Sequence, residues 1–221
     1  MLNASERLSP QSLPEQVAAW LVKEISEERL APGQKITEQQ IAEQCSVSRG
    51  PVRDALRLVE KIGLVTLLPR RGAMVAKLDV EEVSELFEIR AAMTKLLVSW
   101  ILDRATRQEL KKLVDLSQQL NQLLEDPEAF FHTANEVGGA FVELAQSNKL
   151  GELLEPVHTQ LLRYRHHAFM TLKARKSSAR GHQKIAKAML AGDVESAHKL
   201  VDDMAKDLKL AAISALADTT G

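Results

Sequence analysis

Apolar positions in the first third of the chain follow helical spacing and then change to short, strand-like runs. Thr37 and Gln40 have the form of a capping box, and Gly63 stands where a helix C-terminal cap is expected. Two apolar runs on either side of a Pro-Arg-Arg-Gly turn favour a β-hairpin. The pattern predicts helices over about residues 14–30, 37–45 and 48–62, and hairpin strands over about 64–68 and 73–76.

Beyond Asp79 the periodicity is helical throughout, and nothing in it is typical of a strand. Asp126 and Asp193 stand at N-cap positions. The short connections predict an antiparallel bundle of about six helices. The expected helices span residues 80–104, 106–125, 127–147, 149–173, 176–191 and 193–217, with one break at Lys176-Ser177-Ser178.

The two patterns divide the chain near Lys77–Asp79, into a domain of residues 1–77 and a domain of residues 78–221. Three helices and a hairpin, with a tight turn at Ser46-Val47, are typical of a winged helix-turn-helix. The expected fold class is therefore mainly α: a winged helix-turn-helix of three helices plus a β-hairpin, followed by an all-α helical bundle.

Composition favours a globular, helix-rich protein. Of the 221 residues, 45% are hydrophobic and 27% charged, and only 4% are aromatic. No apolar stretch approaches the roughly 18 residues of a membrane span, and the N-terminus does not have the form of a secretory signal, so a cytoplasmic location is expected. The single Cys45 excludes an internal disulfide and is expected to be a core residue rather than a redox sensor.

The formal net charge of -1 hides a gradient along the chain. Residues 46–77 hold seven basic and two acidic residues, whereas residues 78–221 hold 18 basic and 21 acidic ones. A short basic segment on a mildly acidic body is the electrostatic pattern of a DNA reader attached to another module.

Several side chains of the basic segment suit DNA. Arg49 and Arg53 lie four apart at the start of the third helix, where a guanidinium can bind guanine O6 and N7. Ser48 and the backbone amides of the helix start, at Gly50, suit phosphate contacts. Arg70 and Arg71 occupy the hairpin tip, which can approach the minor groove or the backbone. The alternative is that the helix arginines, with Arg57, form an ordinary solvated face.

At these residues the sequence resembles the DNA-binding domain of GntR-family regulators, over LAPGQKITEQQIAEQCSVSRGPVRDALRLVEKIGLVTLLPRRGAMV. The resemblance implies that Arg49 and Arg53 match the family's recognition-helix arginines and that Gly72 matches its wing glycine. Gln39 stands where many members have an arginine, which implies a weaker or different DNA contact there. Ser46 replaces the glycine that is usual in the turn.

Residues from Asp79 to about Ala217 resemble the FadR-type C-terminal (FCD) domain, an all-helical effector-binding and dimerisation module. The likeness rests on ELFEIRAAM, SNKL and GHQKIAKAMLAGDVESA, and six helices would place it near the VanR-like branch. Many such domains hold a metal through one aspartate and three histidines. The matching positions here are Asn135, Gly139, His182 and Met204, so only one ligand of four remains and no metal cofactor is expected.

The same positions imply an effector pocket without a metal. Arg90, in ELFEIR, would project into the bundle, and a buried arginine needs an anionic partner. That partner is either internal, for example Glu136 or Glu143, or a carboxylate of the ligand. The remaining histidines are scattered over the helices and are expected to be surface or satisfied core residues, although His132 could approach the pocket.

The sequence therefore predicts a homodimeric, effector-responsive repressor of transcription that binds an inverted-repeat operator. A constitutive DNA-binding dimer, whose helical domain binds no ligand, is the alternative. An enzyme is not expected, because the helical half has no Gly-rich phosphate loop, nucleophile elbow, Cys/His pair or intact metal set.

Overall fold

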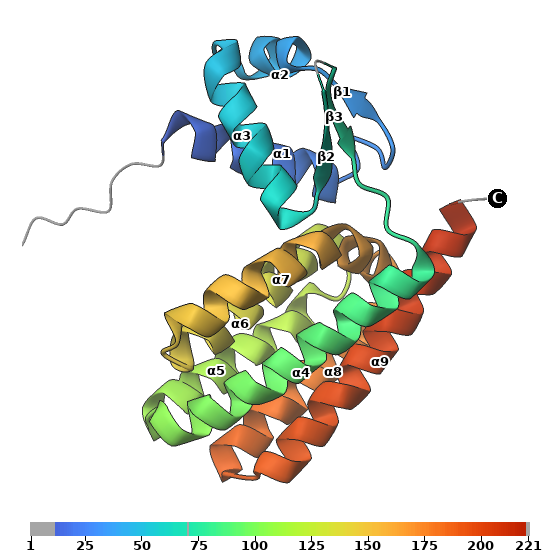
Figure 1. Ribbon diagram of the computed structural model, residues 1–221. Coiled ribbons are helices and arrows are strands. Elements are labelled where there is room, and N and C mark those ends of the chain that lie inside the picture. The colour runs from blue at the N-terminus through green and yellow to red at the C-terminus, as the bar shows by residue number, and fades with distance from the viewer. Residues whose placement is uncertain (1–11, 70, 220–221) are drawn as a thin grey trace, which may run out of the picture. The chain divides into compact units, whose positions relative to one another are not determined.

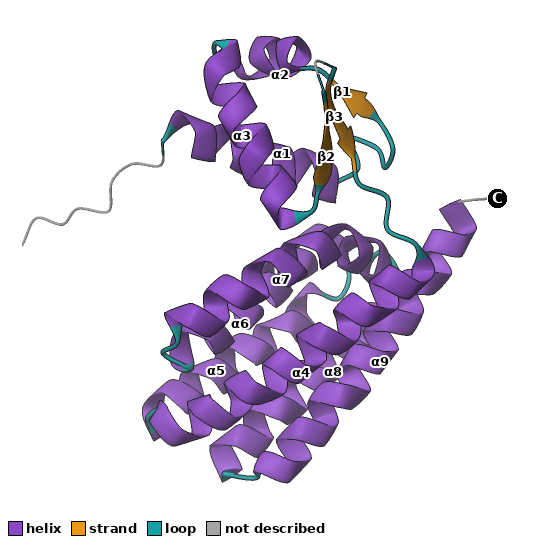
Figure 2. Cartoon of the chain, viewed as in Figure 1, coloured by secondary structure: helices purple, strands orange, loops and turns teal. Residues whose placement is uncertain are grey.

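The computed structural model describes residues 12–69 and 71–219 (Figures 1 and 2). The chain divides between Lys77 and Leu78 into two compact units. The first is a winged helix-turn-helix and the second is all-helical over its described residues, which confirms the predicted fold class.

The first unit combines three helices with a small antiparallel sheet. Strand β3 lies between β1 and β2, and Leu68 of β2 pairs with Gly72 of β3 across the wing turn. Strand β1 was not predicted, because two residues are too few to show the period-two alternation of a strand. The elements are α1 (Leu13–Ser26), β1 (Lys35–Ile36), α2 (Glu38–Cys45), α3 (Arg49–Ile62), β2 (Val65–Leu68) and β3 (Gly72–Val75).

Local capping positions the helices of this unit. The Thr37 hydroxyl accepts a hydrogen bond from the Gln40 amide, so the predicted capping box is confirmed. Gly63 caps α3 in the left-handed conformation, as expected. Ser46, in the turn between α2 and α3, has a φ of 56°, which costs more for serine than for glycine. The turn therefore keeps its left-handed geometry although the glycine is absent.

The second unit is built from six α-helices and one 3₁₀ helix within the described residues. Helix α9 packs against α4, α7 and α8, and α5 lies against α6 and α8 (Figure 1). No helix in the described part of the chain is long and apolar enough to cross a membrane. The elements are α4 (Val80–Arg104), α5 (Arg107–Gln119), η1 (Leu120–Leu123), α6 (Pro127–Leu144), α7 (Asn148–Phe169), α8 (Leu172–Ala191) and α9 (Val194–Thr219).

One predicted boundary in this unit is wrong. The break expected at Lys176-Ser177-Ser178 lies instead at Met170–Thr171, where the Thr171 hydroxyl accepts from the Ala174 amide and caps α8. Ser178 is buried inside α8, so its polarity does not mark a loop. The predicted caps at Asp126 and Asp193 are confirmed, since each carboxylate accepts a backbone amide three residues later.

Candidate nucleic-acid interface and buried arginine cluster

The N-terminal end of α3 presents two arginines to solvent. Val52 and Leu56 are buried on the apolar face of the helix, and Arg49 and Arg53 lie at the edge of this face with their side chains toward solvent. Their side chains are 64% and 56% exposed. The structure therefore brings the two predicted base-reading residues together on one accessible face.

Ser48 is the N-cap residue of α3, but its hydroxyl makes no capping hydrogen bond. Pro51 occupies the third helical position and has no amide hydrogen, which removes one of the two usual capping donors. The Ser48 side chain is exposed and is not used by the helix. Gly50 is exposed too, and a side chain added there would meet no atom within 4 Å.

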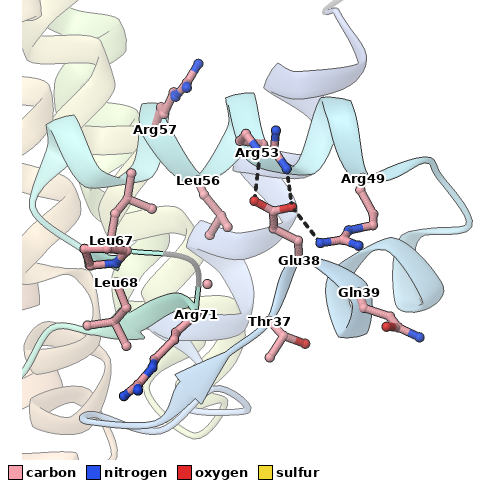
Figure 3. A pocket seen from close by; sticks show the side chains of 12 residues that line it. Thr37, Glu38, Gln39, Arg49, Arg53, Leu56, Arg57, Leu67, Leu68 and Arg71 are labelled. Carbon is pink, nitrogen blue, oxygen red and sulfur yellow. Dashed lines mark hydrogen bonds and ion pairs between the residues drawn. The ribbon is translucent and has the colours of Figure 1, made fainter.

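Glu38, the first residue of α2, binds both arginines. Its carboxylate accepts two hydrogen bonds of 2.9 Å from Arg53 Nε and Nη2, and one of 3.3 Å from Arg49 Nη2 (Figure 3). The hydrogen bond from Arg53 lowers the pKa of Glu38, against the opposing effect of its partial burial. The Glu38 side chain is itself only 17% exposed, so a largely covered carboxylate holds two guanidinium groups whose side chains are mostly exposed.

A hollow of about 660 Å³ lies between α3 and the wing. Arginines and leucines both line it, and Arg57 points away from Glu38 (Figure 3). Such a surface combines cationic groups with apolar atoms, as a DNA-facing surface does. The lining residues are Thr37, Glu38, Gln39, Arg49, Arg53, Leu56, Arg57, Leu67, Leu68, Pro69, Arg71 and Gly72.

The wing turn depends on Gly72. This residue has a φ of 87°, and a Cβ placed on it would lie 2.1 Å from the Ile36 carbonyl oxygen of β1. No side chain fits there without moving the backbone. Arg71, the preceding residue, is exposed and lines the hollow, whereas Arg70 lies outside the described residues.

Gln39 and Cys45, two further residues of this unit, are both neutral: Gln39 lies on the surface and Cys45 against the core. Gln39 is exposed and its amide donates to the Glu43 carboxylate at 3.0 Å, so the position that matches a family arginine carries no charge here. Burial, assisted by the charge of Glu24, raises the pKa of the Cys45 thiol. A thiol held protonated is a poor nucleophile, in line with a core role for Cys45.

In the second unit, Arg165 of α7 is buried with only 1% of its surface exposed. Its Nη1 donates to Asn135 Oδ1 of α6 at 2.7 Å and lies 3.4 Å from His158 Nδ1. Its Nε is buried without a hydrogen-bond partner, and the same holds for the Nε of Arg90 on α4. Within the described residues, no carboxylate pairs with either guanidinium group.

The internal partners expected for Arg90 are therefore wrong. Glu136 and Glu143 are both exposed, and neither forms a described ion pair with Arg90. The prediction that Arg90 points into the bundle is confirmed, because its Nε is buried, as are the nearby residues Phe87 and Ala91. Helix periodicity determined the direction of the side chain but not the identity of its partner.

Burial and mutual repulsion dominate the electrostatics of this cluster. Desolvation lowers the pKa of Arg165 well below its usual value and that of Arg90 to about 10. Burial, with repulsion from Arg165 and Arg90, lowers the pKa of His158 to about 2 and that of His182 to about 4. Both histidines are therefore neutral near pH 7.

His182 lies inside α8 with its Nδ1 2.9 Å from the Ser178 carbonyl oxygen. Since that oxygen only accepts, Nδ1 carries the proton of the neutral ring and Nε2 keeps a lone pair. Gly139 lies one turn after Asn135, and a side chain there would meet no atom within 4 Å. Met204 packs against Gly181, where an added Cβ would lie 2.8 Å from its sulfur.

The four positions that match the family's metal ligands do not fit a divalent metal ion. Asn135 offers an amide oxygen that already accepts from the Arg165 cation, Gly139 offers no side chain, and Met204 offers a soft thioether. Within the described chain, no three His, Cys, Asp or Glu side chains gather in a way that could hold a metal. The expectation that no metal cofactor binds stays a prediction.

Sequence reasoning missed Glu38 and Arg165. The ion pairs of Glu38 span 11 and 15 residues, and no local pattern reveals such a separation. Arg165 could have been found: Leu161 and Phe169 lie four residues before and after it, and both are buried. That spacing places Arg165 on the core-facing side of α7.

Comparisons with known proteins agree with the fold. Residues 13–75 match the family "Bacterial regulatory proteins, gntR family", and residues 85–206 match the FCD domain. The chain is 32% identical over 131 residues to an HTH-type transcriptional regulator of Bacillus subtilis (strain 168), YdhC, and spans 58% of both chains there, little more than half the length of that relative. It is 24% identical over 195 residues to the transcriptional repressor GlaR of Escherichia coli (strain K12), which covers 82% of this chain and 87% of GlaR. The solved structure of E. coli McbR/YncC is similar in fold, with a TM-score of 0.75 at 21% identity over 89% of this chain and 95% of that one.

Proposed function

Since the chain belongs to the gntR family of bacterial regulatory proteins and carries an FCD domain, we propose that it is an effector-responsive transcription regulator that binds an inverted-repeat operator as a homodimer. Its relatives are named as transcriptional regulators and repressors, not as enzymes. We expect repression of transcription in the cytoplasm, with release from DNA controlled by a small molecule.

The observation that carries this proposal is the exposed arginine pair at the start of α3, beside the wing. A recognition helix enters the major groove with its first turn against the base edges. There Arg49 and Arg53 have the length and the donor geometry to bind guanine O6 and N7. The exposed Ser48 hydroxyl and the first amides of α3 then suit a phosphate, and Arg71 suits the neighbouring groove or backbone.

Glu38 has a positioning role in this proposal. Two arginines on an exposed helix would sample many rotamers, and each rotamer lost on binding costs affinity. The carboxylate of Glu38 limits both guanidinium groups to one side of α3 before DNA arrives. It also offsets part of their charge, which lowers affinity for any phosphate backbone and so favours sequence-dependent binding.

A two-fold dimer would present two such surfaces to one duplex, which is why the operator is expected to be an inverted repeat. The dimerisation role is assigned to residues 78–221 by their match to the FCD domain. The alternative of a constitutive dimer receives no support from the helical unit, because buried guanidinium groups without a carboxylate are unfavourable unless a ligand supplies one.

The proposal is tested by selecting binding sites for the purified chain from a randomised duplex library, with the mass of the free protein measured by light scattering. We expect a dimer and an inverted repeat whose half-sites are about one helical turn apart. Recovery of duplexes without any shared sequence would contradict a sequence-reading role, and a monomer that binds a single half-site would contradict the dimer.

A further inference from the structure

The exposed face of α8 carries charge of a single sign. Five basic side chains recur along it at intervals of three or four residues, so they form one line along the helix. All five are exposed, whereas the apolar side of α8, which includes Ile185 and Met189, is buried. This line, the α8 basic stripe, consists of Lys173, Lys176, Arg180, Lys184 and Lys187.

We infer that the α8 basic stripe is a second nucleic-acid-binding surface, which holds the phosphate backbone of duplex DNA without reading its sequence. It is separate from the surface at the start of α3, because its residues belong to the second unit. The inference goes beyond the proposed function, which uses this unit for dimerisation and for the response to an effector.

The stripe has no acidic counterpart. Helix α8 contains no Asp or Glu, whereas each of the other five α-helices described in this unit contains at least one. None of the stripe residues forms an ion pair within the described part of the chain, and Arg180 Nε donates to the Lys176 carbonyl oxygen at 3.1 Å. Because residues 78–221 hold 21 acidic and 18 basic residues, the positive charge of the stripe is a local feature and does not follow from the net charge of the unit.

The arrangement of these charges destabilises α8 itself. Like charges three or four residues apart on a helix repel each other. Lys173 also lies in the first turn, where the helix dipole disfavours a positive charge, and the last turn has no basic residue that would interact favourably with the dipole. On α9, by contrast, the exposed Lys199 and Lys206 lie three or four residues from Asp202 and Asp203. Helix stability therefore does not explain the stripe, whereas binding of a polyanion does.

The length and the composition of the stripe suit a duplex. Lys173 and Lys187 are 14 residues apart, which at 1.5 Å per residue corresponds to about 21 Å along the helix. Duplex DNA carries one phosphate charge per about 1.7 Å of its axis, so a line of this length meets several phosphates in any sequence. Four of the five residues are lysines, whose flexible point charges suit phosphates, whereas Arg49 and Arg53 have the planar donors that suit guanine.

Two other anionic partners suit the stripe less well. A helix that binds a membrane surface inserts an apolar face into the lipid, but the apolar side of α8 is buried in the core of the unit, where α8 packs against α5 and α9. The core of a protein–protein interface is depleted of lysine. A phosphate backbone requires a line of accessible cations, which is what α8 presents.

The test uses the full chain without its base-reading arginines, Arg49→Ala/Arg53→Ala, and a random-sequence duplex. In this background we expect residual binding that weakens as salt is added. Adding Lys176→Gln/Arg180→Gln/Lys184→Gln should weaken the residual binding about ten- to a hundredfold and reduce the slope of log affinity against log salt by about two to three. Fluorescence anisotropy at four salt concentrations measures both quantities.

A variant of equal charge is the control. In the same background, Lys149→Gln/Lys199→Gln/Lys206→Gln removes three positive charges from exposed positions outside the stripe, and it should lower the residual affinity less than about threefold. Equal losses in the two triple variants would overturn the inference, because binding would then depend on net charge alone. The stripe variant should melt at or above the temperature of its background protein, since repulsion within α8 is removed. A lower melting temperature would show that the stripe is structural.

Two further probes identify the kind of polyanion. We expect the background protein to bind phosphatidylglycerol vesicles and poly-glutamate more weakly than the random duplex at equal salt. We also expect this weak binding to be the same in the stripe variant. Stripe-dependent binding to either probe that equals binding to the duplex would overturn the assignment of DNA as the partner.

Failure of this inference and failure of the proposed function give different results. With Arg49 and Arg53 intact, the stripe substitutions should lower the affinities for operator and for random duplex together and preserve their ratio. A chain that selects no shared sequence but keeps stripe-dependent duplex binding would contradict the regulatory function and support the stripe. A chain that selects an inverted repeat and binds random duplex equally well with and without the stripe would support the function and overturn the inference.

Discussion

The two units of this protein use arginine in opposite circumstances. On α3, Arg49 and Arg53 are more than half exposed and share one carboxylate, Glu38. In the helical unit, Arg165 is buried and has no described carboxylate partner, and the buried Nε of Arg90 has no partner either. The residue type is the same in both units. The arginines of α3 are hydrated and have a carboxylate partner, whereas Arg165 is buried and has no described one.

The two pairs of arginines therefore differ in what they need from a ligand. An exposed guanidinium is hydrated and has an ionic partner before DNA binds. On binding it exchanges the water and the partner for a base edge at little net cost, so the gain is specificity, which comes from the geometry of the contact. A buried guanidinium without a partner is unfavourable until an anion arrives, so it gains from charge neutralisation itself. The first unit thus presents arginines that a nucleic acid can reach, whereas the second holds a buried arginine without a described carboxylate partner.

The largest effect is expected for the exposed arginines of α3. Arg53→Ala and Arg49→Ala should each lower operator affinity about ten- to a hundredfold, because a bidentate contact to guanine is lost. Fluorescence anisotropy with the selected operator measures this. Arg57→Ala, which changes an arginine that points away from Glu38, is the control and should lose less than about threefold. Equal losses at all three positions would mean that the face binds DNA without reading it.

In the helical unit, we expect acid to destabilise the protein through protonation of His158. Burial, with repulsion from Arg165 and Arg90, lowers its folded-state pKa from 6.5 to about 2. Between these values the unfolded chain binds a proton that the folded chain excludes, so stability falls as pH falls below about 6.5, by at most about 1.4 kcal/mol per pH unit.

Melting curves between pH 7.5 and pH 4.5 test this dependence. His158→Gln should melt with a shallower pH dependence than the wild type, since the group that takes up the proton is gone. The exposed His132 provides the matched variant, His132→Gln, whose profile should follow that of the wild type. A wild-type curve that coincides with the His158→Gln curve would show that the imidazole titrates normally.

Glu38→Gln should separate affinity from specificity. The change removes the charge that restrains Arg49 and Arg53, so affinity for random-sequence DNA should rise while the ratio of operator to random binding falls about three- to tenfold. Competition of labelled operator against random duplex gives that ratio. An unchanged ratio would show that the arginines need no positioning before binding.

The smallest effect is expected at the wing. If Arg71 contacts a phosphate, Arg71→Ala should weaken binding similarly for all duplexes and reduce the slope of log affinity against log salt by about one. Titrations at four salt concentrations measure the slope. A loss confined to the operator, with the slope preserved, would instead indicate that Arg71 reads bases.

Much of the fold follows from local chemistry and could be predicted. Thr37, Gly63, Asp126 and Asp193 mark helix ends because each satisfies nearby backbone groups by itself. The prediction went wrong at Ser178, where polarity suggested a loop. There the hydroxyl lies inside α8, in a buried environment next to His182, and no local signal distinguishes the two cases.

The sequence alone determined the helix start that carries Arg49 and Arg53, the glycine that the wing requires, and the inward direction of Arg90. Each follows from spacing of a few residues along one element. Only the tertiary structure decided which groups meet: Glu38 with the arginines of α3, and Arg165 with Asn135 of α6 instead of with a carboxylate. The physical reason is that two ionic groups pair only when they are close in space, whatever their separation in sequence. Burial by neighbouring elements then determines how strong the interaction between them is.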